Sequence, residues 1–502
     1  MKFKLFLLLF ISLFTFLSQQ LMAKNVEKVL LPVKDDPTIS FRIWFKVGSQ
    51  DDPKGKEGLA YITAKMLTDA STRNNTYEKI LEKLYPIASS YSQKVDKEMT
   101  VIYGRTHKDN VNEFYQLFTD AILYPAFSED DFKRIKTNAL NYIQNDLRYS
   151  NDEELGKAAL YGFVFEGTPY SHLTIGTVES LNNMTLDDVR GFYERYYNRY
   201  NFVIGLAGGY DDKLVEKLEK DLSRLGDVRS QTPPKPNVKP IQGYNFLLIE
   251  KDADATAISF GFPINILRND EDFVALWVFN SWFGEHRNQS SHLYQVIREK
   301  RGLNYGDYSY IETFLDGGQR NMPEPNNPRR QQIFEVWIRP VQNQHRHFAL
   351  RAALRELKKV VDNGLRKDDF ELTKKFLYSY SLNYAQTTMD KLGYQIDSKF
   401  YGVNDDGNYI SYFRKKLNSL KLEDVNRAIK KYIQYDNIKF AIVTKNAEEF
   451  KEELINNIPS PITYVTQVDE SVLKEDLEIQ NYQLNIDRDK IKIIKVDEMF
   501  QK

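Results

Sequence analysis

The stretch Ser128-Glu-Asp-Asp-Phe132 has a counterpart much further along the chain, Arg366-Lys-Asp-Asp-Phe370. Both stretches place acidic side chains where they favour the first turn of a helix, because the positive end of the helix dipole lies there. A second pair follows in the same order, since Leu186-Asp-Asp-Val189 recurs as Leu422-Glu-Asp-Val425 at almost the same separation. Two such pairs at nearly equal spacing predict two copies of one structural unit.

Strand-like stretches follow the same repeat. Asn201-Phe-Val-Ile-Gly-Leu206 recurs as Lys439-Phe-Ala-Ile-Val443, and Phe202 is as far from Phe440 as Phe132 is from Phe370. Other stretches alternate apolar and polar residues, as strands with one buried face do: Ile39, Phe41, Ile43, Phe45 and Val47 in the first copy, and Ile258, Phe260, Phe262 and Ile264 in the second. Between them lie helical stripes such as the one over residues 111–122. We predict an α+β fold of two homologous domains, each a mainly antiparallel sheet with helices packed on one face.

A proline-rich segment separates the two copies. Residues 231–240, Gln-Thr-Pro-Pro-Lys-Pro-Asn-Val-Lys-Pro, show no apolar periodicity and indicate an extended linker. The predicted domains are therefore residues 24–230 and 244–464, joined by a linker over 231–243. A charged extension, 465–502, follows, and its alternation from Ile491 to Val496 predicts a strand that pairs outside the second core. A second loop, Gly317–Arg330, is expected to be exposed and mobile and to touch a substrate or partner.

The N-terminus predicts export. Lys2 and Lys4 precede an apolar run from Leu5 to Leu17, and a small residue, Ala23, follows. This pattern is typical of a cleavable signal peptide over residues 1–23, with a retained anchor as the alternative. The absence of cysteine excludes disulfides and thiolate metal sites. A net charge of −1 gives no support for nucleic-acid binding, and we expect an exported, periplasmic protein without stable membrane insertion.

The sequence resembles the insulinase/pitrilysin-type zinc peptidases, in particular their bacterial processing-peptidase-like branch. Four stretches in a specific order carry the resemblance: the strand to Val47 followed by Gly48-Ser49, Gly167-Thr-Pro-Tyr170 with Gly176, Leu186–Val189 followed by Tyr196-Tyr197, and Leu293–Tyr305. The resemblance extends over nearly the whole chain after the signal peptide. It implies the half-shell architecture of the processing-peptidase type.

The zinc motif of that family is degenerate here. Active members carry H-x-x-E-H on the first helix after the opening strands, with two His ligands and a Glu base. The matching stretch, Gly58–Leu67, has Tyr61 in place of the first His, Ala64 in place of the Glu and Lys65 in place of the second His. Glu154 matches the third ligand, and we expect it to face solvent or to pair with a base. The chain is thus interpreted as a non-catalytic homologue without a metal or cofactor of its own.

The six histidines do not predict a replacement metal site. No two of them are spaced i, i+4, and the nearest pair, His345 and His347, opens an Arg-rich helix that we expect to present a solvated face. No G-x-S-x-G elbow or phosphate-binding loop is present either.

Two residues of the second copy match a substrate-contacting pair of the family. The resemblance implies that Arg298 and Tyr305 reach the substrate at a zinc site, which in paired bacterial members lies in the other subunit. Here a helix is predicted to end over Arg298–Gly302, and a strand to begin at Leu303. A guanidinium can hold a peptide carbonyl, and a phenol can donate to a developing oxyanion. The alternative is a basic helix C-terminus followed by an ordinary strand tyrosine.

These observations favour a non-catalytic subunit of a heterodimeric periplasmic zinc peptidase. The catalytic partner is expected to carry an intact H-x-x-E-H and the zinc, while this chain is inactive alone and closes a chamber around the peptide. A stand-alone binding or structural protein of the same fold is the alternative, and a hydrolase that uses unrecognised residues ranks last.

Overall fold

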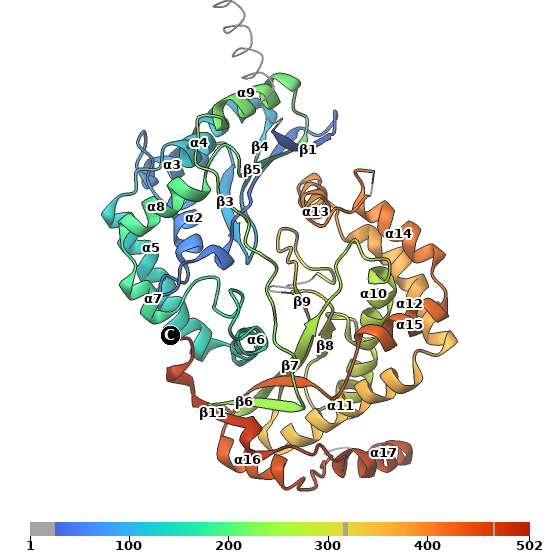
Figure 1. Ribbon diagram of the computed structural model, residues 1–502. Coiled ribbons are helices and arrows are strands. Elements are labelled where there is room, and N and C mark those ends of the chain that lie inside the picture. The colour runs from blue at the N-terminus through green and yellow to red at the C-terminus, as the bar shows by residue number, and fades with distance from the viewer. Residues whose placement is uncertain (1–25, 315–319, 405, 465–466) are drawn as a thin grey trace, which may run out of the picture.

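The computed structural model describes residues 26–314, 320–404, 406–464 and 467–502, so the predicted signal peptide lies outside the described residues. The described residues form two sheets, one in each half of the chain (Figure 1). The first has the order β1-β5-β2-β4-β3, in which β1 pairs with β5 in parallel and the other pairs are antiparallel. Its strands are β1 (Glu27–Pro32), β2 (Thr38–Phe45), β3 (Ser90–Val95), β4 (Thr100–His107) and β5 (Phe202–Gly208).

The second sheet has the order β11-β6-β10-β7-β9-β8. The pairs β11–β6 and β6–β10 are parallel, and the other three are antiparallel. Its strands are β6 (Tyr244–Glu250), β7 (Ala255–Ile264), β8 (Asp307–Tyr310), β9 (Gln332–Gln342), β10 (Ile438–Thr444) and β11 (Ile491–Lys495). Both sheets are mixed and mainly antiparallel, as predicted.

Helices of the same half cover one face of each sheet. On the first sheet the apolar sides of α2 (Leu59–Thr68), α4 (Val111–Leu123), α5 (Glu129–Asn141) and α8 (Leu186–Tyr196) join the strand residues in one core. On the second sheet the corresponding core contains α10 (Phe273–Gly284), α11 (Arg346–Asn363), α12 (Lys367–Tyr380), α14 (Tyr409–Ser419), α15 (Leu422–Tyr432) and α16 (Ala447–Ile455). The repeated stretches open equivalent helices: α5 and α12, and α8 and α15. The predicted duplication is thereby confirmed.

The other face of each sheet is covered by a helix from the opposite half (Figure 1). Helix α6 (Asp152–Val164) packs Leu155 and Leu160 against Val443 in the second sheet. Helix α13 (Thr388–Tyr401) packs Ile396 against Val203 in the first sheet. The separation of these two helices along the chain matches that of α8 and α15, so they are equivalent elements of the repeat that have been exchanged between the halves.

This exchange explains a departure from the predicted pattern. The alternation in β2 predicted one buried and one polar face, yet Ser40, Arg42 and Trp44 on the second face are also buried. The Trp44 ring contacts Phe400 of α13 at a centroid distance of 5.9 Å. A helix that is distant in the sequence therefore converts a polar-looking face into an interior one.

The loop before β9 is also buried, contrary to the expectation of an exposed loop. Residues 315–319 lie outside the description, but Met322, Asn326 and Arg329 are at most 2% exposed. Arg329 forms a bidentate ion pair with Asp96 in the β3–β4 hairpin, with N–O distances of 2.6 and 2.7 Å. The loop is therefore held between the halves because its charged side chains find partners on the first half.

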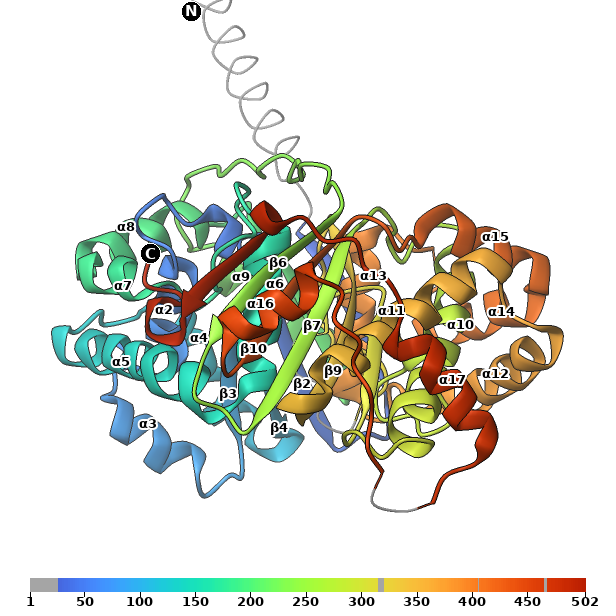
Figure 2. The same ribbon diagram turned by 90° about the horizontal axis from the view of Figure 1, so that it is seen from below.

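The C-terminal extension ties the halves together. Its predicted strand, β11, lies at the edge of the second sheet and not outside that core, because Ile491 packs into it. The chain then crosses to the first half (Figure 2), where the Met499 carbonyl accepts hydrogen bonds from Arg148 and the Phe500 carbonyl accepts one from the Val178 amide at 3.1 Å.

The expectation that His345 and His347 lie on a solvated face is wrong. The two side chains are 8% and 3% exposed, and Arg346 between them donates to the Lys445 carbonyl at 2.6 Å and pairs with Glu453 at 3.2 Å. Helix α11 runs through the second core, so its polar first turn is buried against β10 and α16. Burial lowers the pKa of His347 to about 3. Among the described residues, no helix is long and apolar enough to cross a membrane.

We expect the exchanged helices to be essential for stability. Ile396→Ala removes a fully buried side chain between α13 and the first sheet, and we expect it to lower the free energy of unfolding by about 2–5 kcal/mol. Leu372→Ala, at a side chain that is 69% exposed in the same half, is the matched control and should change it by less than about 0.5 kcal/mol. Urea denaturation measures both. Equal effects of the two substitutions would contradict the exchange.

Candidate functional site

A cavity of about 480 Å³ lies between the two halves. The first half contributes residues from α2, α5, α6, the end of β3 and the loop 172–175. The second half contributes Phe314, Arg329 and Trp337. Because the exchange fixes α6 on the second sheet, neither half forms this cavity alone.

The degenerate motif faces this cavity. Tyr61 and Lys65, one turn apart on α2, both line it, and so does Glu154 from the first turn of α6. Ala64 is fully buried in the helix and does not line the cavity. The structure therefore brings together three of the four positions that the sequence predicted as the remnant of a zinc site.

The N-terminus of α2 is positioned by a buried carboxylate. Asp52 accepts hydrogen bonds at 2.7 Å from the amides of Gly58 and Ala60, and His172 lies 3.2 Å from it. Gly58 has a φ of 94°, and a Cβ there would lie 2.4 Å from the Ile175 carbonyl oxygen. Glycine is thus required where α2 approaches the loop that forms another wall of the cavity.

The charged groups at the motif positions are already paired. Lys65 Nζ lies 2.7 Å from Asp69 and 5.9 Å from the centre of the Tyr61 ring. Lys157 Nζ lies 2.8 Å from Glu154 and 3.6 Å from the centre of the Trp337 ring. Glu154 is 42% exposed and pairs with a base, as expected.

These residues do not fit a catalytic zinc ion. An ammonium group stands at a position where the family has an imidazole ligand, and it brings a positive charge to the place where the cation would sit. The carboxylate at the third ligand position, Glu154, is paired with Lys157. Within the described ranges, no three His, Asp or Glu side chains gather closely enough to hold a metal ion.

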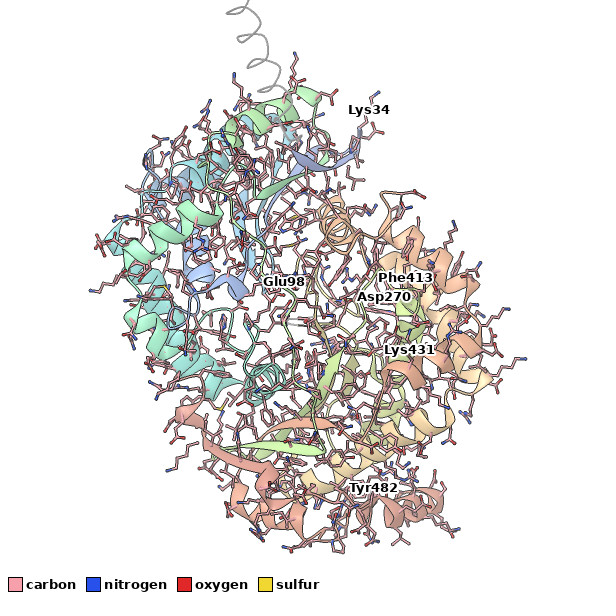
Figure 3. All side chains as sticks on the ribbon, viewed as in Figure 1. Lys34, Glu98, Asp270, Phe413, Lys431 and Tyr482 are labelled. Carbon is pink, nitrogen blue, oxygen red and sulfur yellow. The ribbon has the colours of Figure 1, made fainter. Side chains whose placement is uncertain are left out.

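The most unusual charge in the cavity belongs to Lys97, in the β3–β4 hairpin. Its side chain is 3% exposed, and Nζ donates to the His172 carbonyl. Burial, together with the neighbouring charge of Arg329, lowers the pKa of Lys97 to about 7. The next residue, Glu98, lies between the halves (Figure 3) and accepts a hydrogen bond from the Arg330 amide at 2.7 Å. Sequence reasoning missed this hairpin, because three consecutive charged residues normally indicate an exposed turn.

A second carboxylate is buried behind the cavity wall. Glu335 on β9 accepts hydrogen bonds from Trp337 at 2.9 Å and from Tyr161 of α6 at 3.0 Å. Burial raises the pKa of Glu335 to about 7. The bond from Tyr161 joins α6 to the second sheet, and the bond from Trp337 holds its indole ring within β9.

Arg298 and Tyr305 do not line this cavity. Arg298 is half-buried in the helical turn Tyr294–Glu299, and Tyr305 is 78% exposed. The strand begins at Asp307 and not at Leu303. The side-chain amide of Asn304 donates to the Asp307 carboxylate at 2.8 Å and to the Arg339 carbonyl at 3.2 Å, and these bonds hold a turn before the strand. The role of both residues in a partner's site stays a prediction.

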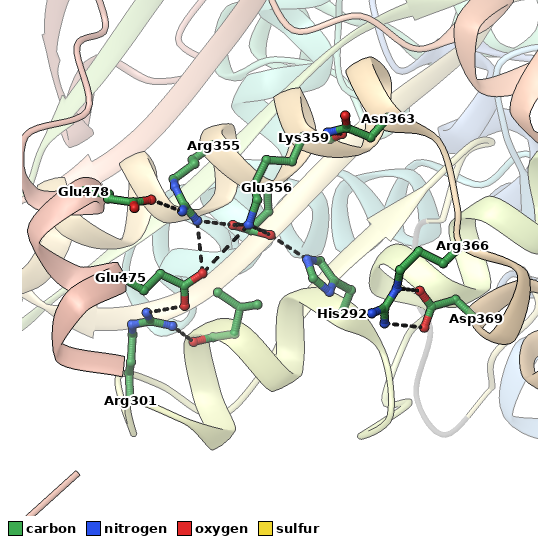
Figure 4. A network of polar contacts seen from close by, with 11 residues as sticks. His292, Arg301, Arg355, Glu356, Lys359, Asn363, Arg366, Asp369, Glu475 and Glu478 are labelled. Carbon is green, nitrogen blue, oxygen red and sulfur yellow. Dashed lines mark hydrogen bonds and ion pairs between the residues drawn. The ribbon is translucent and has the colours of Figure 1, made fainter. Parts of the chain in front are cut away.

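A polar network holds the segment that carries Arg298 and precedes Tyr305 (Figure 4). Arg301 pairs at 2.8 Å with Glu475 and with Asp476 of α17 (Glu470–Gln480), and His292 lies 2.6 Å from Glu356 of α11. Although burial alone would raise it, the pKa of Glu356 is lowered to about 2 by His292 and Lys359. The segment from His292 to Arg301 is thus held at both ends.

We expect Lys97→Met to stabilise the protein in a pH-dependent way. Below pH 7 Lys97 is charged in both the folded and the unfolded chain, and folding then bears the full cost of burying the ammonium group. Between pH 7 and 10.5 only the unfolded chain binds this proton, so the cost falls as pH rises. The lowering of the pKa of Lys97 from 10.5 to about 7 corresponds to a cost of about 5 kcal/mol for burying the charged ammonium group.

Urea denaturation at pH 6 and pH 9.5 measures this difference. The increase in the free energy of unfolding caused by Lys97→Met should be at least about 1 kcal/mol larger at pH 6 than at pH 9.5. Lys34→Met, at an exposed lysine, should change the free energy of unfolding little at either pH. A gain that does not depend on pH would show that Lys97 is not buried as a costly charge.

Comparison with known proteins matches both halves of the chain to one peptidase family. The model of the insulinase family (peptidase family M16) matches residues 28–177, and that of the peptidase M16 inactive domain matches residues 183–377. A protein described as an uncharacterized zinc protease of Rickettsia bellii is 28% identical over 284 residues, which are 56% of this chain and 66% of that protein. The match thus spans just under two thirds of the relative's length.

Solved structures show the same fold. The peptidase M16 inactive domain from Pseudomonas fluorescens superposes with a TM-score of 0.73 at 20% identity, over 84% of this chain and 96% of that one. A chain of complex III from Candida albicans gives 0.62 at 16% identity, over 83% and 93%. Together with the replaced positions in the cavity, these findings show that the chain belongs to the insulinase-type (M16) peptidase family as a non-catalytic homologue.

Proposed function

We propose that this chain is the non-catalytic subunit of an exported, heterodimeric zinc peptidase. The observation that carries the proposal is the state of the cavity that would hold the metal, where Lys65 is paired with Asp69 and Glu154 with Lys157. A chain that retains the whole fold around such a cavity can still contribute surface and substrate contacts to a relative that keeps the zinc. The partner would carry the intact H-x-x-E-H and supply the metal-bound water for hydrolysis.

The position of Arg298 and Tyr305 supports this assignment. Tyr305 is exposed and lies outside the chain's own cavity, so its phenol is available to another molecule. The network around Arg301 and Glu356 holds the preceding segment in place, which is what a preorganised substrate contact needs. Export through the predicted signal peptide would place the complex in the periplasm.

A second candidate is a stand-alone binding protein. The observation that favours it is the cavity itself, which is lined by both halves of one chain. On this alternative, Arg298 and Tyr305 have no substrate, and the protein acts through a ligand bound in its own cavity.

Association with a catalytic relative is the first test. The purified chain alone should cleave no peptide and hold no stoichiometric zinc, because its motif positions lack two ligands and the base. Co-expression with a family member that keeps H-x-x-E-H should yield a complex that co-purifies, contains zinc and hydrolyses peptides. Two independent monomers at micromolar concentration, seen by sedimentation, would rule out a stable complex.

Tyr305→Phe is the sharper test, because it keeps the ring and removes only the hydroxyl. If the phenol donates to the developing oxyanion, peptide hydrolysis by the complex should fall by about a hundredfold or more, equivalent to about 3 kcal/mol. The complex should stay assembled and keep its zinc. Tyr85→Phe, at an 87% exposed tyrosine of the other half, is the matched control and should leave turnover unchanged. Equal rates for all three complexes would mean that Tyr305 has no role in the reaction.

A further inference from the structure

Most cationic side chains that line the interdomain cavity have a carboxylate partner. Lys65 pairs with Asp69 at 2.7 Å, Arg134 with Asp131 at 2.7 Å, Lys157 with Glu154 at 2.8 Å and Arg329 with Asp96 at 2.6 Å. These four charges are neutralised within the protein. Nη1 of Arg329 has no hydrogen-bond partner among the described residues, but the charge of Arg329 is matched by Asp96.

Lys97 differs from these four. In the part of the chain that the structure describes, its Nζ forms no ion pair with a carboxylate, and the acceptor that it has is a carbonyl, that of His172. It is also almost completely buried, beside the guanidinium of Arg329. The nearby carboxylates of Asp96 and Asp52 favour its charged form, but Asp96 is paired with Arg329, and Asp52 lies 3.2 Å from His172. A buried ammonium group without an ion pair of its own is unfavourable, so a negative group placed in the cavity would relieve that cost.

An aromatic wall from the second half also lines the cavity. Phe314 and Trp337 belong to it, with ring centroids 6.1 Å apart, and Tyr310 packs behind both at 4.4 and 4.1 Å. Apolar side chains from the first half complete the lining, among them Ile135, Leu147 and Ile175. A volume of about 480 Å³ is within the range of pockets that bind small organic ligands.

We propose that this cavity binds an organic carboxylate, with the carboxylate at Lys97 and an apolar or aromatic body against Phe314 and Trp337. One cation without an ion pair of its own matches a single negative charge, which favours a carboxylate over a phosphate dianion. The same chemistry occurs at the free C-terminus of a peptide that ends in a large apolar residue and in a small free acid. The site uses this chain's own residues, so it does not depend on the catalytic partner proposed above.

Calorimetric titration of the purified protein tests the site with two acids and their amides. The probes are 3-phenylpropionate and a tripeptide that ends in phenylalanine, each with a free carboxylate and as the neutral amide. At least one acid should bind, and its amide should bind at least tenfold more weakly. Binding of the tripeptide acid alone identifies a peptide C-terminus, whereas binding of 3-phenylpropionate identifies a small acid. If neither acid binds at millimolar concentration, or if acids and amides bind equally, the proposal is wrong.

Lys97→Met assigns the binding to this residue. The substitution keeps an unbranched side chain of similar length and removes the charge, and we expect at least a tenfold loss of affinity for the acid. Because the variant should be more stable than the natural protein, loss of binding cannot be attributed to unfolding, and its melting temperature checks this. Lys34→Met removes the same charge at an exposed edge far from the cavity (Figure 3) and should leave binding unchanged. Equal affinity in the natural protein and in Lys97→Met would overturn the assignment.

Discussion

The exchange of α6 and α13 is the constraint on which the rest of the structure depends. Each sheet has one face covered by its own helices and the other by a helix of the opposite half, so each half lacks part of its own core. The buried side chains of Leu155 and Ile396 can be removed from water only when both halves are folded and docked. The two copies of the repeat therefore form one folding unit, although they resemble two domains in sequence.

This constraint also builds the cavity. The first turn of α6 carries Glu154, the next turn carries Lys157, and the same helix lies on the second sheet, so Lys157 meets the Trp337 ring of the other half. The Arg329–Asp96 pair crosses the same boundary. Buried ion pairs contribute less to stability than their short distances suggest, because both charges lose hydration, but they disfavour other relative positions of the halves. The cavity walls are thus fixed by contacts that have no connection with a metal.

Because these contacts do not involve the metal-ligand positions, the fold persists without the zinc site. On α2 the side chains of Leu59, Ile62 and Met66 face the core, whereas Tyr61 and Lys65 face the cavity. A helix with two independent faces can lose the chemistry of one and keep the packing of the other. The resemblance to the family identified the degenerate positions in the sequence, and the helical register of α2, fixed by its apolar face, explains why Tyr61 and Lys65 both reach the cavity.

What sequence analysis missed has a common physical cause. Local patterns predicted the strands, the helices and the repeat, but they assign a polar or charged stretch to solvent. Here Arg42, Lys97, Arg329 and His347 are all buried because partners from distant parts of the chain cover them. Three of these four residues lie where the halves meet, and no short-range periodicity encodes a contact of that kind. The start of β8 and the burial of the loop before β9 were mispredicted for a similar reason, since side-chain hydrogen bonds to distant carbonyls and carboxylates set them.

Lys97 shows why the cavity is more than the remains of a lost site. A methionine at this position would fill the same space without a buried charge, and substitutions that remove such costs are readily available to a protein of marginal stability. Four other cavity cations were given carboxylate partners by the fold, and this one was not. A charge that weakens the folded state, in a cavity whose other cations are paired, has a physical rationale when a ligand supplies the counter-charge. The cost in the empty protein then becomes part of the free energy of binding.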